Sequence, residues 1–275
     1  DNPLWNARRQ RLYWVDVLAP ALRWWDPATR AAGRLDLTQI TAGLAFDESD
    51  RIMALGEKGL CLLDETHGSL TTLLNPEADR EDNRFNIASV DGAGRLWAGT
   101  MAVNHEVGKG SLYSLEPGLV ARRRIERVGT PKNVAFDSAG ERMYFADTAE
   151  QAVFAYEFDA ATGDLGERRV FVKGDASSQP GGITVDEEDH LWVTFLGGWC
   201  VRRFAPDGSL TGECILPIPM PMNCAFGGPD LKTLYFTTAR KGLSDEALAQ
   251  YPLSGGLFAF NVDVAGQPQH EVRLV

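Results

Sequence analysis

The segment NVAFDSAGERMYFAD, from Asn133 to Asp147, contains two short apolar stretches joined by polar residues. The first stretch, NVAF, is mostly apolar, as is typical of a strand buried on both faces. Asp137, Ser138 and Gly140 favour a turn, because Asp and Ser bond to nearby backbone and Gly accepts a positive φ. The second stretch, MYFA, is rich in aromatic residues, which favours a strand. The segment therefore predicts a β-hairpin.

The same hairpin pattern is found five more times along the chain. Steps of 41 to 49 residues separate the positions that open its turns, which are Asn6, Asp47, Asp91, Asp137, Asp186 and Gly227. A period in the forties with several strands in each copy is typical of a β-propeller blade. We therefore predict an all-β, six-bladed β-propeller that forms a single domain over residues 1–275. The other copies are PLWNARRQRLYWVD from Pro3, GLAFDESDRIMAL from Gly43, IASVDGAGRLWAG from Ile87, GITVDEEDHLWVT from Gly182 and NCAFGGPDLKTLYFT from Asn223.

Composition and charge narrow the functional classes. The chain is 44% hydrophobic and 24% charged, as expected of a globular protein, and its net charge is −11. Nucleic-acid binding needs clustered Lys and Arg, so an acidic chain argues against it. No apolar run approaches the ~20 residues of a membrane helix, and no signal peptide is recognisable. We expect a cytoplasmic protein, a monomer or small homo-oligomer, whose partner is a small-molecule substrate.

Smaller features give further expectations. The cysteines, Cys61, Cys200, Cys214 and Cys224, have no metal-site spacing, so we expect four buried reduced thiols. The stretch SDEALAQ predicts one short helix from Ser244 to Gln250, with Ser244 as its N-cap. The sequence opens abruptly at Asp1, which leaves an upstream segment open.

Several segments resemble a known family. They include NRFNIASVDGAGRLWAGTM from Asn83, GGITVDEEDHLWV from Gly181, LYFTTAR from Leu234 and GGLFAF from Gly255. These segments are similar, in the same order, to signature segments of the family that joins senescence marker protein (regucalcin), gluconolactonase and luciferin-regenerating enzyme. The resemblance covers essentially the whole chain. It implies a six-bladed propeller and an enzyme, since known members are largely metal-dependent sugar lactonases with a divalent cation near the central axis.

The resemblance also implies where that cation is held. The family's ligands lie five residues before each turn position, which here gives Asp1, Ala42, Asn86, Lys132, Gly181 and Met222. Members normally have Glu where this chain has Asp1, Asn where it has Lys132 and Asp where it has Gly181, while Asn86 is retained. Ile87 also replaces the Asp that usually follows the retained Asn. A one-residue slip in the fourth repeat would place Asn133 at the axis instead of Lys132.

These replacements predict an altered metal centre. Hard cations such as Ca²⁺ need several oxygen ligands, and an ammonium among them adds a like charge. We therefore expect no cofactor, and if a divalent cation (Ca, Zn, Mg or Fe) binds, its ligands are Asp1 and Asn86. Lys132 is predicted to be a catalytic residue together with Asp1. A buried lysine with a lowered pKa can orient a carbonyl, form an imine or act as a base, and the alternative is a solvated or salt-bridged lysine at a degenerate site.

The resemblance suggests further substrate-binding residues. Arg84 and Asn86 match the family's contacts to substrate oxygens, although Arg84 can also close an interblade salt bridge. Asp147 matches a family aspartate that accepts a sugar hydroxyl, or it is a plain turn cap. His105 and Glu106 lie in a loop that folds over the family's pocket and can supply an acid or a base, although a loop histidine is also ordinary by chance.

The leading interpretation is a hydrolase-like enzyme that acts on a small polar carbonyl compound, a sugar lactone or related cyclic ester, in a pocket on the axis. In this interpretation Lys132 replaces the usual divalent metal. Three alternatives stay open: a lyase or isomerase that forms an imine at Lys132, a small-molecule-binding propeller without chemistry, and an ordinary metal-dependent lactonase.

Overall fold

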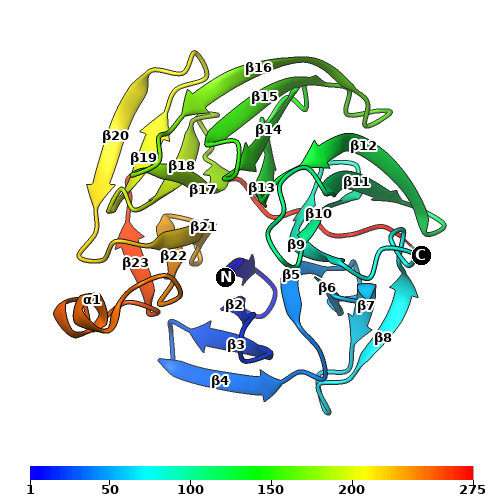
Figure 1. The fold of residues 1–275 in the computed structure, drawn as a ribbon, viewed down its shortest axis with the longest axis horizontal. Coiled ribbons are helices and arrows are strands. Elements are labelled where there is room, and N and C mark those ends of the chain that lie inside the picture. Colours follow the sequence, from blue (N-terminus) through cyan, green and yellow to red (C-terminus); the bar gives the residue numbers. More distant parts are fainter. Residues whose placement is uncertain (275) are drawn as a thin grey trace.

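Six antiparallel sheets surround a central axis in the computed structural model, which describes residues 1–274 (Figure 1). Each sheet consists of strands that follow one another in the chain, so each is one propeller blade. Five blades have four strands, and the sixth has three, in the order β21-β22-β23. The predicted all-β, six-bladed propeller is confirmed.

The strands of each blade follow one another in order from the axis outward. The inner strands are β1 (Leu4–Asn6), β5 (Thr41–Phe46), β9 (Asn83–Val90), β13 (Pro131–Phe136), β17 (Gln179–Val185) and β21 (Pro221–Gly227). The second strands are β2 (Arg11–Asp16), β6 (Ile52–Gly56), β10 (Leu96–Ala102), β14 (Arg142–Asp147), β18 (Leu191–Leu196) and β22 (Thr233–Thr238). The third strands are β3 (Ala21–Asp26), β7 (Gly59–Leu63), β11 (Gly110–Glu116), β15 (Ala152–Phe158), β19 (Cys200–Phe204) and β23 (Leu257–Asn261). The outer strands are β4 (Ala31–Asp36), β8 (Leu70–Leu74), β12 (Val120–Val128), β16 (Leu165–Lys173) and β20 (Leu210–Ile215).

The repeated aspartates close the first hairpin of their blades. Oδ1 of Asp137 accepts hydrogen bonds from the backbone N–H groups of Glu141 at 2.9 Å and Arg142 at 3.0 Å. Asp91 binds two backbone N–H groups of its turn in the same way, and its Oδ2 also accepts a hydrogen bond from the Trp97 indole at 3.0 Å. These carboxylates therefore form turns and do not face the axis.

The ring closes by side-chain packing between the first and last blades. Trp5 of β1 stacks on Tyr235 of β22, with ring centroids 6.2 Å apart and an interplanar angle of 9°. Gly227 at the end of β21 leaves room for this indole, because a Cβ there would lie 2.8 Å from it. Both rings are almost fully buried and join Leu12 in one cluster. An apolar contact therefore holds the two ends of the ring together.

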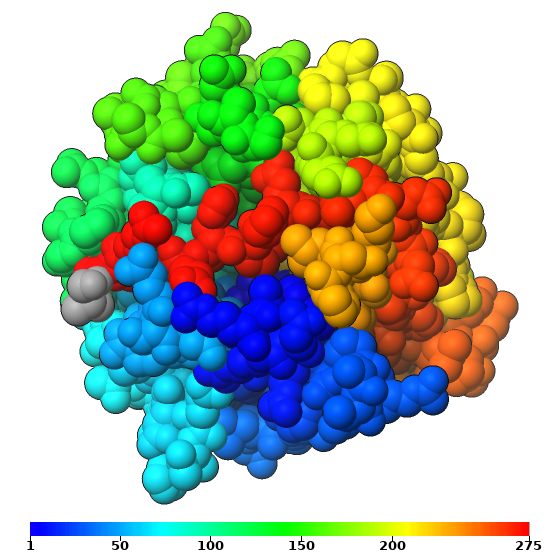
Figure 2. Space-filling model, turned by 180° about the vertical axis from the view of Figure 1, so that it is seen from behind, coloured from blue at the N-terminus to red at the C-terminus, as the bar shows by residue number. Residues whose placement is uncertain are grey.

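The C-terminal segment, residues 266–274, crosses the face of the ring seen in Figure 2, which we call the lower face. Its Val272 N–H donates to the Phe46 carbonyl at 2.8 Å in blade 2, and the Arg273 N–H donates to Gly94 at 2.9 Å in blade 3. At its start, Gly266 forms a bridge with Asp186 of blade 5. The segment therefore links blade 5 to blades 2 and 3.

The smaller predictions are largely confirmed. Helix α1 (Asp245–Gln250) lies at the edge of blade 6, and Oγ of Ser244 accepts a hydrogen bond from the Ala247 N–H at 3.2 Å. All four cysteines are free; three are buried, and Cys214 is half-buried. Within residues 1–274, none of the helical structure has the length and apolar character that crossing a membrane would require.

Candidate active site

A β-bulge recurs at one position of the inner strand. In blades 2 to 6 the pairing between the inner and second strands shifts register at this position. A bulge redirects a side chain out of the regular alternation of a strand. The bulged positions are Ala42, Asn86, Lys132, Gly181 with Gly182, and Met222, and Asp1 precedes β1 in blade 1. These are the positions that the sequence repeat singled out.

Four of these residues line a cavity on the axis, which we call the upper cavity. Asp1, Asn86, Lys132 and Met222 contribute to its wall, whereas Ala42 and Gly181 do not. The cavity has a volume of about 740 Å³, which lies in the range of small-molecule sites. Strand ends and loops of several blades complete it, with Arg84, Met101, His105, Thr130 and Thr237 among the lining residues.

Lys132 lies at the floor of the upper cavity and is only 6% exposed. Its Nζ is 3.7 Å from Oδ2 of Asp1, so an ammonium and a carboxylate from different blades face each other. Burial, and secondly the positive charge of Arg84, lower the pKa of Lys132 to about 8. The predicted pairing of Lys132 with Asp1 is therefore present in the geometry.

The alternative register for the fourth blade is not observed. Asn133, one residue after Lys132, donates from Nδ2 to the Ile183 carbonyl at 3.0 Å, and its Oδ1 accepts from Ser89 Oγ at 2.5 Å. Its amide is thus satisfied between blades, below the level of Lys132.

Arg84 and Asn86 lie side by side in the wall. Nη1 of Arg84 donates to Oδ1 of Asn86 at 2.8 Å and to the Phe85 carbonyl at 3.0 Å. Nδ2 of Asn86 donates to the Pro131 carbonyl at 2.8 Å, which orients its amide. Nη2 of Arg84 contacts only Sδ of Met101, at 3.8 Å, among its hydrogen-bond partners in residues 1–274. This nitrogen can therefore donate to a ligand.

The remaining predicted site residues are not all brought together. His105 lines the upper cavity, and burial and three nearby cations lower its pKa, so it is neutral at pH 7. Glu106 lies in an outer groove and pairs with Lys109 at 3.2 Å. Asp147 is buried away from the cavity, where its carboxylate accepts the backbone N–H groups of Gly129 at 2.8 Å and Thr130 at 2.7 Å. Asp147 thus caps the loop that leads into Lys132.

Comparisons with known proteins show the family to which the chain belongs. Residues 1–240 match the family described as SMP-30/Gluconolactonase/LRE-like region. The chain belongs to this family. It is 35% identical to 6-deoxy-6-sulfogluconolactonase of Pseudomonas putida (96% of this chain, 91% of that protein) and 30% identical to pentonolactonase XacC of Haloferax volcanii (100% and 95%). The crystal structure of a calcium-binding protein, regucalcin, from Agrobacterium tumefaciens superimposes with a TM-score of 0.94 at 27% identity, covering 100% of this chain and 93% of that one.

The donor set of this SMP-30/gluconolactonase family member does not suit a divalent cation. Asp1 is the only carboxylate among the six axial positions, and the Lys132 ammonium lies 3.7 Å from it. The oxygen of Asn86 already accepts from Arg84. Within the described residues no group of three or more His, Cys, Asp or Glu side chains is placed to hold a metal ion. A hard cation here would face two positive side chains with one carboxylate to balance it.

The surroundings of Gly181 give a steric reason against a metal ligand at residue 181. A Cβ at this position would lie 2.5 Å from Oγ1 of Thr194 and 2.8 Å from the Met222 carbonyl, and it would also overlap Leu196. The packing of blades 5 and 6 has closed over the space that a side chain at residue 181 would occupy. An aspartate at this position would require Leu196 and Thr194 of the same blade, and the Met222 carbonyl of the next blade, to move.

Asparagines close the axis directly below the upper cavity. Nδ2 of Asn223 donates to Oδ1 of Asn2 at 2.7 Å, and Nδ2 of Asn2 donates to the Asn86 carbonyl at 2.9 Å and to the Ala42 carbonyl. Gly182 makes room for this layer, because any Cβ there would overlap the Asn223 amide. The family member therefore has a polar partition across its axis.

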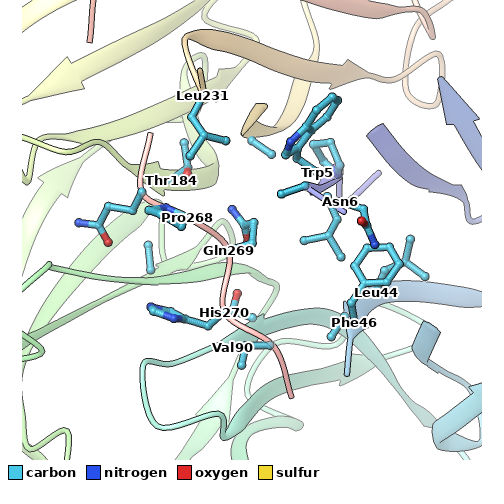
Figure 3. A pocket seen from close by; sticks show the side chains of 18 of the residues that line it. Trp5, Asn6, Leu44, Phe46, Val90, Thr184, Leu231, Pro268, Gln269 and His270 are labelled. Carbon is cyan, nitrogen blue, oxygen red and sulfur yellow. The ribbon is translucent and has the colours of Figure 1, made fainter. Parts of the chain in front are cut away.

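A second cavity of about 280 Å³, the lower cavity, lies on the other side of the asparagines. Figure 3 shows Trp5, Leu44 and Phe46 in its wall, with Gln269 and His270 of the C-terminal segment crossing its opening. Its lining mixes apolar residues such as Leu44 and Phe46 with polar ones such as Ser89, Asn133 and Gln269.

Sequence reasoning missed the basic residues at the mouth of the upper cavity. Arg23, Arg240 and Lys241 all line it. The stretch TTARKG begins at the end of β22. The end of β22 corresponds to the end of β14 in blade 4, where Asp147 is a predicted substrate-binding residue, so the repeat pointed to this stretch as well.

Proposed function

We propose that this protein is a lactonase-family hydrolase that opens a sugar lactone in the upper cavity, with Lys132 in place of a divalent cation. Two relatives that align with this chain over nearly their whole length are named as lactonases, which supports the reaction class. The mechanism depends on one observation, the Lys132–Asp1 pair, whose Nζ and Oδ2 atoms lie 3.7 Å apart at the cavity floor.

Lys132 acts in this proposal as an ammonium. A pKa of about 8 leaves most of the amine protonated at neutral pH. A buried ammonium can donate hydrogen bonds to the oxyanion that develops on the lactone carbonyl oxygen. The neutral amine would instead attack the carbonyl carbon and leave a stable amide, so turnover requires the protonated form.

Asp1 acts as the base. Its Oδ1 accepts the backbone N–H of Asn2 at 3.0 Å, which holds the carboxylate beside Lys132. Asp1 takes a proton from water while the water oxygen bonds to the carbonyl carbon, and the π electrons move to the oxygen next to Lys132. The bond between that carbon and the ring oxygen then breaks, and the proton on Asp1 passes to the ring oxygen. The product is the open hydroxy acid.

Arg84 and Asn86 position the substrate. The amide of Asn86 holds one terminal nitrogen of Arg84, so the other nitrogen points at a ligand without rotamer freedom to lose. Arg84 also keeps the pKa of Lys132 below its ordinary value, since both cations share the cavity.

The test combines chelation with a substitution. Hydrolysis of a panel of sugar 1,4- and 1,5-lactones would be followed by proton release, before and after dialysis against EDTA. We expect activity to survive dialysis and to fall about 10²- to 10³-fold in Lys132→Met. Lys232→Met, an exposed lysine at the other end of β22, is the matched control and keeps full activity. Full activity in Lys132→Met, or loss on dialysis with recovery on adding a divalent cation, would refute the mechanism.

A second function is favoured by the lowered pKa of the buried Lys132. An amine with a pKa of about 8 is partly neutral under physiological conditions, and it can attack a keto carbon and release water to form an imine. The protein would be incubated with pyruvate and longer 2-keto acids in the presence of borohydride, and its intact mass measured. An adduct that is absent from Lys132→Met supports this lyase or isomerase function, and no adduct rejects it.

A further inference from the structure

The upper cavity gathers positive charge in an acidic protein. Five cationic side chains and two carboxylates line it, although the whole chain has a net charge of −11. The cations are Arg23, Arg84, Lys132, Arg240 and Lys241, and the carboxylates are Asp1 and Asp16. A cleft lined by one sign of charge attracts ligands of the other sign.

The two carboxylates form ion pairs with only two of the five cations. Arg23 lies 3.7 Å from Asp16, and Lys132 lies 3.7 Å from Asp1. Across residues 1–274, no carboxylate oxygen comes within 4.0 Å of the nitrogens of Arg84, Arg240 or Lys241. The cavity lining therefore contains more cationic than anionic side chains, and Arg240 and Lys241 have no carboxylate partner within 4.0 Å in residues 1–274.

Arg240 is held in place at the mouth of the cavity. It follows β22, and its aliphatic stem packs on Gly255, where a Cβ would lie 2.7 Å from Cγ of the arginine. Gly255 also has a φ of 86°, which disfavours other residues. Thr238 fixes this loop, because its Oγ1 donates to the Gly256 carbonyl at 2.8 Å and accepts from the Gly255 N–H at 2.9 Å. The guanidinium is thus supported by its own loop.

Lys241 reaches across the mouth. Its Nζ lies 3.4 Å from Nε2 of His105, which belongs to the loop between β10 and β11 of blade 3. Lys241 itself belongs to blade 6, on the opposite side of the ring (Figure 1). Because His105 is neutral at pH 7, it accepts this hydrogen bond and adds no charge. The ammonium is therefore held over the cavity by a neutral partner and keeps its full charge for a ligand.

We propose that the substrate is a sugar lactone with a fixed negative charge, which Arg240 and Lys241 bind at the mouth while the ring carbonyl lies at Lys132. The charged group is a carboxylate, sulfonate or phosphate at the end of the sugar remote from the carbonyl. This inference rests on the proposed lactone hydrolysis. An anionic group supplies the partner that the two mouth cations lack, and an arginine can bind it through two parallel hydrogen bonds.

The experiment compares charged and neutral lactones. Values of kcat/KM would be measured for glucono-1,5-lactone, its 6-phosphate, its 6-deoxy-6-sulfonate and a glucarolactone, with the wild type and with the double variant Arg240→Gln/Lys241→Gln. We expect at least one anionic lactone to exceed the neutral one about tenfold or more, and to lose about tenfold in the double variant, mainly through KM. The neutral lactone changes less than about twofold, because it makes no ion pair at the mouth. The arm with the highest value identifies the anion.

Controls distinguish the proposed charge preference from the lactone hydrolysis on which it rests. Lys232→Gln, an exposed lysine at the far end of β22, leaves the charge preference unchanged. Added NaCl lowers kcat/KM for the anionic lactone and not for the neutral one. Equal turnover of neutral and charged lactones, or an unchanged preference in the double variant, would overturn the inference while leaving lactone hydrolysis intact. Hydrolysis of none of the lactones would overturn both.

Discussion

The upper and lower cavities are formed by the same six inner strands but differ in their chemistry. At the level of the bulge, the strands place Asp1, Asn86 and Lys132 on the upper cavity. Two residues later, the lower cavity is lined by Pro3, Leu44, Ala88, Val134, Ile183 and Cys224. Two residues of a strand span about 7 Å, so charged strand residues give way to apolar ones over that distance, while polar residues such as Ser89 and Gln269 complete the lower wall. The comparison shows that one level of the repeat determines the chemistry of this ring.

The two ends also differ in how they are closed. The C-terminal segment covers the lower cavity and bonds to blades 2 and 3, so this end contributes to stability. At the upper mouth, Lys241 of blade 6 approaches His105 of blade 3, with Nζ and Nε2 3.4 Å apart, beside the charged residues of the cavity. Stability and function are thus expected to respond to different substitutions.

Asp1→Asn is expected to have the largest effect, at the upper end. It removes the proposed base but keeps the shape of the side chain, so kcat for the best lactone falls about 10²- to 10³-fold with little change in KM. Steady-state kinetics and a thermal melt check this, the melt being expected to stay near that of the wild type. A kcat within about twofold of the wild type would place the base on another residue.

Val272→Asp tests the lower end. Val272 is 2% exposed and joins the apolar cluster of blades 2 and 3, so a carboxylate there loses its hydration without a partner. We expect the free energy of unfolding to drop by about 3 kcal/mol, measured in urea, while kcat/KM below the transition stays within about twofold. A large loss of kcat/KM in folded protein would contradict the separation of the two ends.

The pH dependence follows from the lowered pKa of Lys132. Its ordinary pKa of 10.5 becomes about 8 in the folded protein, so the unfolded chain binds more protons between these two values. Relative to Lys132→Met, the wild type gains about 3 kcal/mol of stability as the pH rises from 8 to above 10.5. Over the same interval kcat falls, because the ammonium is lost. Urea titrations and pH–rate profiles test the two trends, and a kcat that rises through pH 8 would favour the neutral amine.

Gly181→Ala is expected to have the smallest effect, and it acts between the two ends. The new Cβ approaches Thr194 and the Met222 carbonyl, so blades 5 and 6 must separate slightly, at a cost of about 1–3 kcal/mol. Because Met222 lines the upper cavity, KM for the lactone rises severalfold. Calorimetry and kinetics measure these effects, and an unchanged melting temperature would show that residue 181 has room for a ligand.

Much of the fold was predictable because the hairpin pattern occurs six times in the sequence. Each hairpin carries an apolar strand and a turn residue, which is an aspartate in four of the six, so local chemistry and the global ring agree. The repeat, together with the five-residue offset that the family resemblance implies, located Lys132, Asp1 and Asn86, since residues at equal positions of equal blades meet at the axis. Arg84 and His105 were also found, through the family resemblance.

Other parts of the site were not predictable in this way. Glu106 and Lys241 both lie in loops, where no repeat constrains the direction of a side chain, and only the second reaches the cavity. Asp147 follows a strand as a ligand-binding residue would, yet its carboxylate turns back to the Gly129 and Thr130 backbone. Loop geometry depends on contacts between distant segments, which a single repeat unit does not contain.

The sequence by itself determined the propeller and the number of its blades, because hydrophobic periodicity and turn residues act locally, and the family resemblance added the level at which Lys132 and Asp1 enter the axis. Only the tertiary structure decided that Lys132 faces Asp1 at 3.7 Å, that Leu196, Thr194 and the Met222 carbonyl fill the space at Gly181, and that Arg240 and Lys241 line the cavity. These are relations between blades, and closure of the ring brings their residues together.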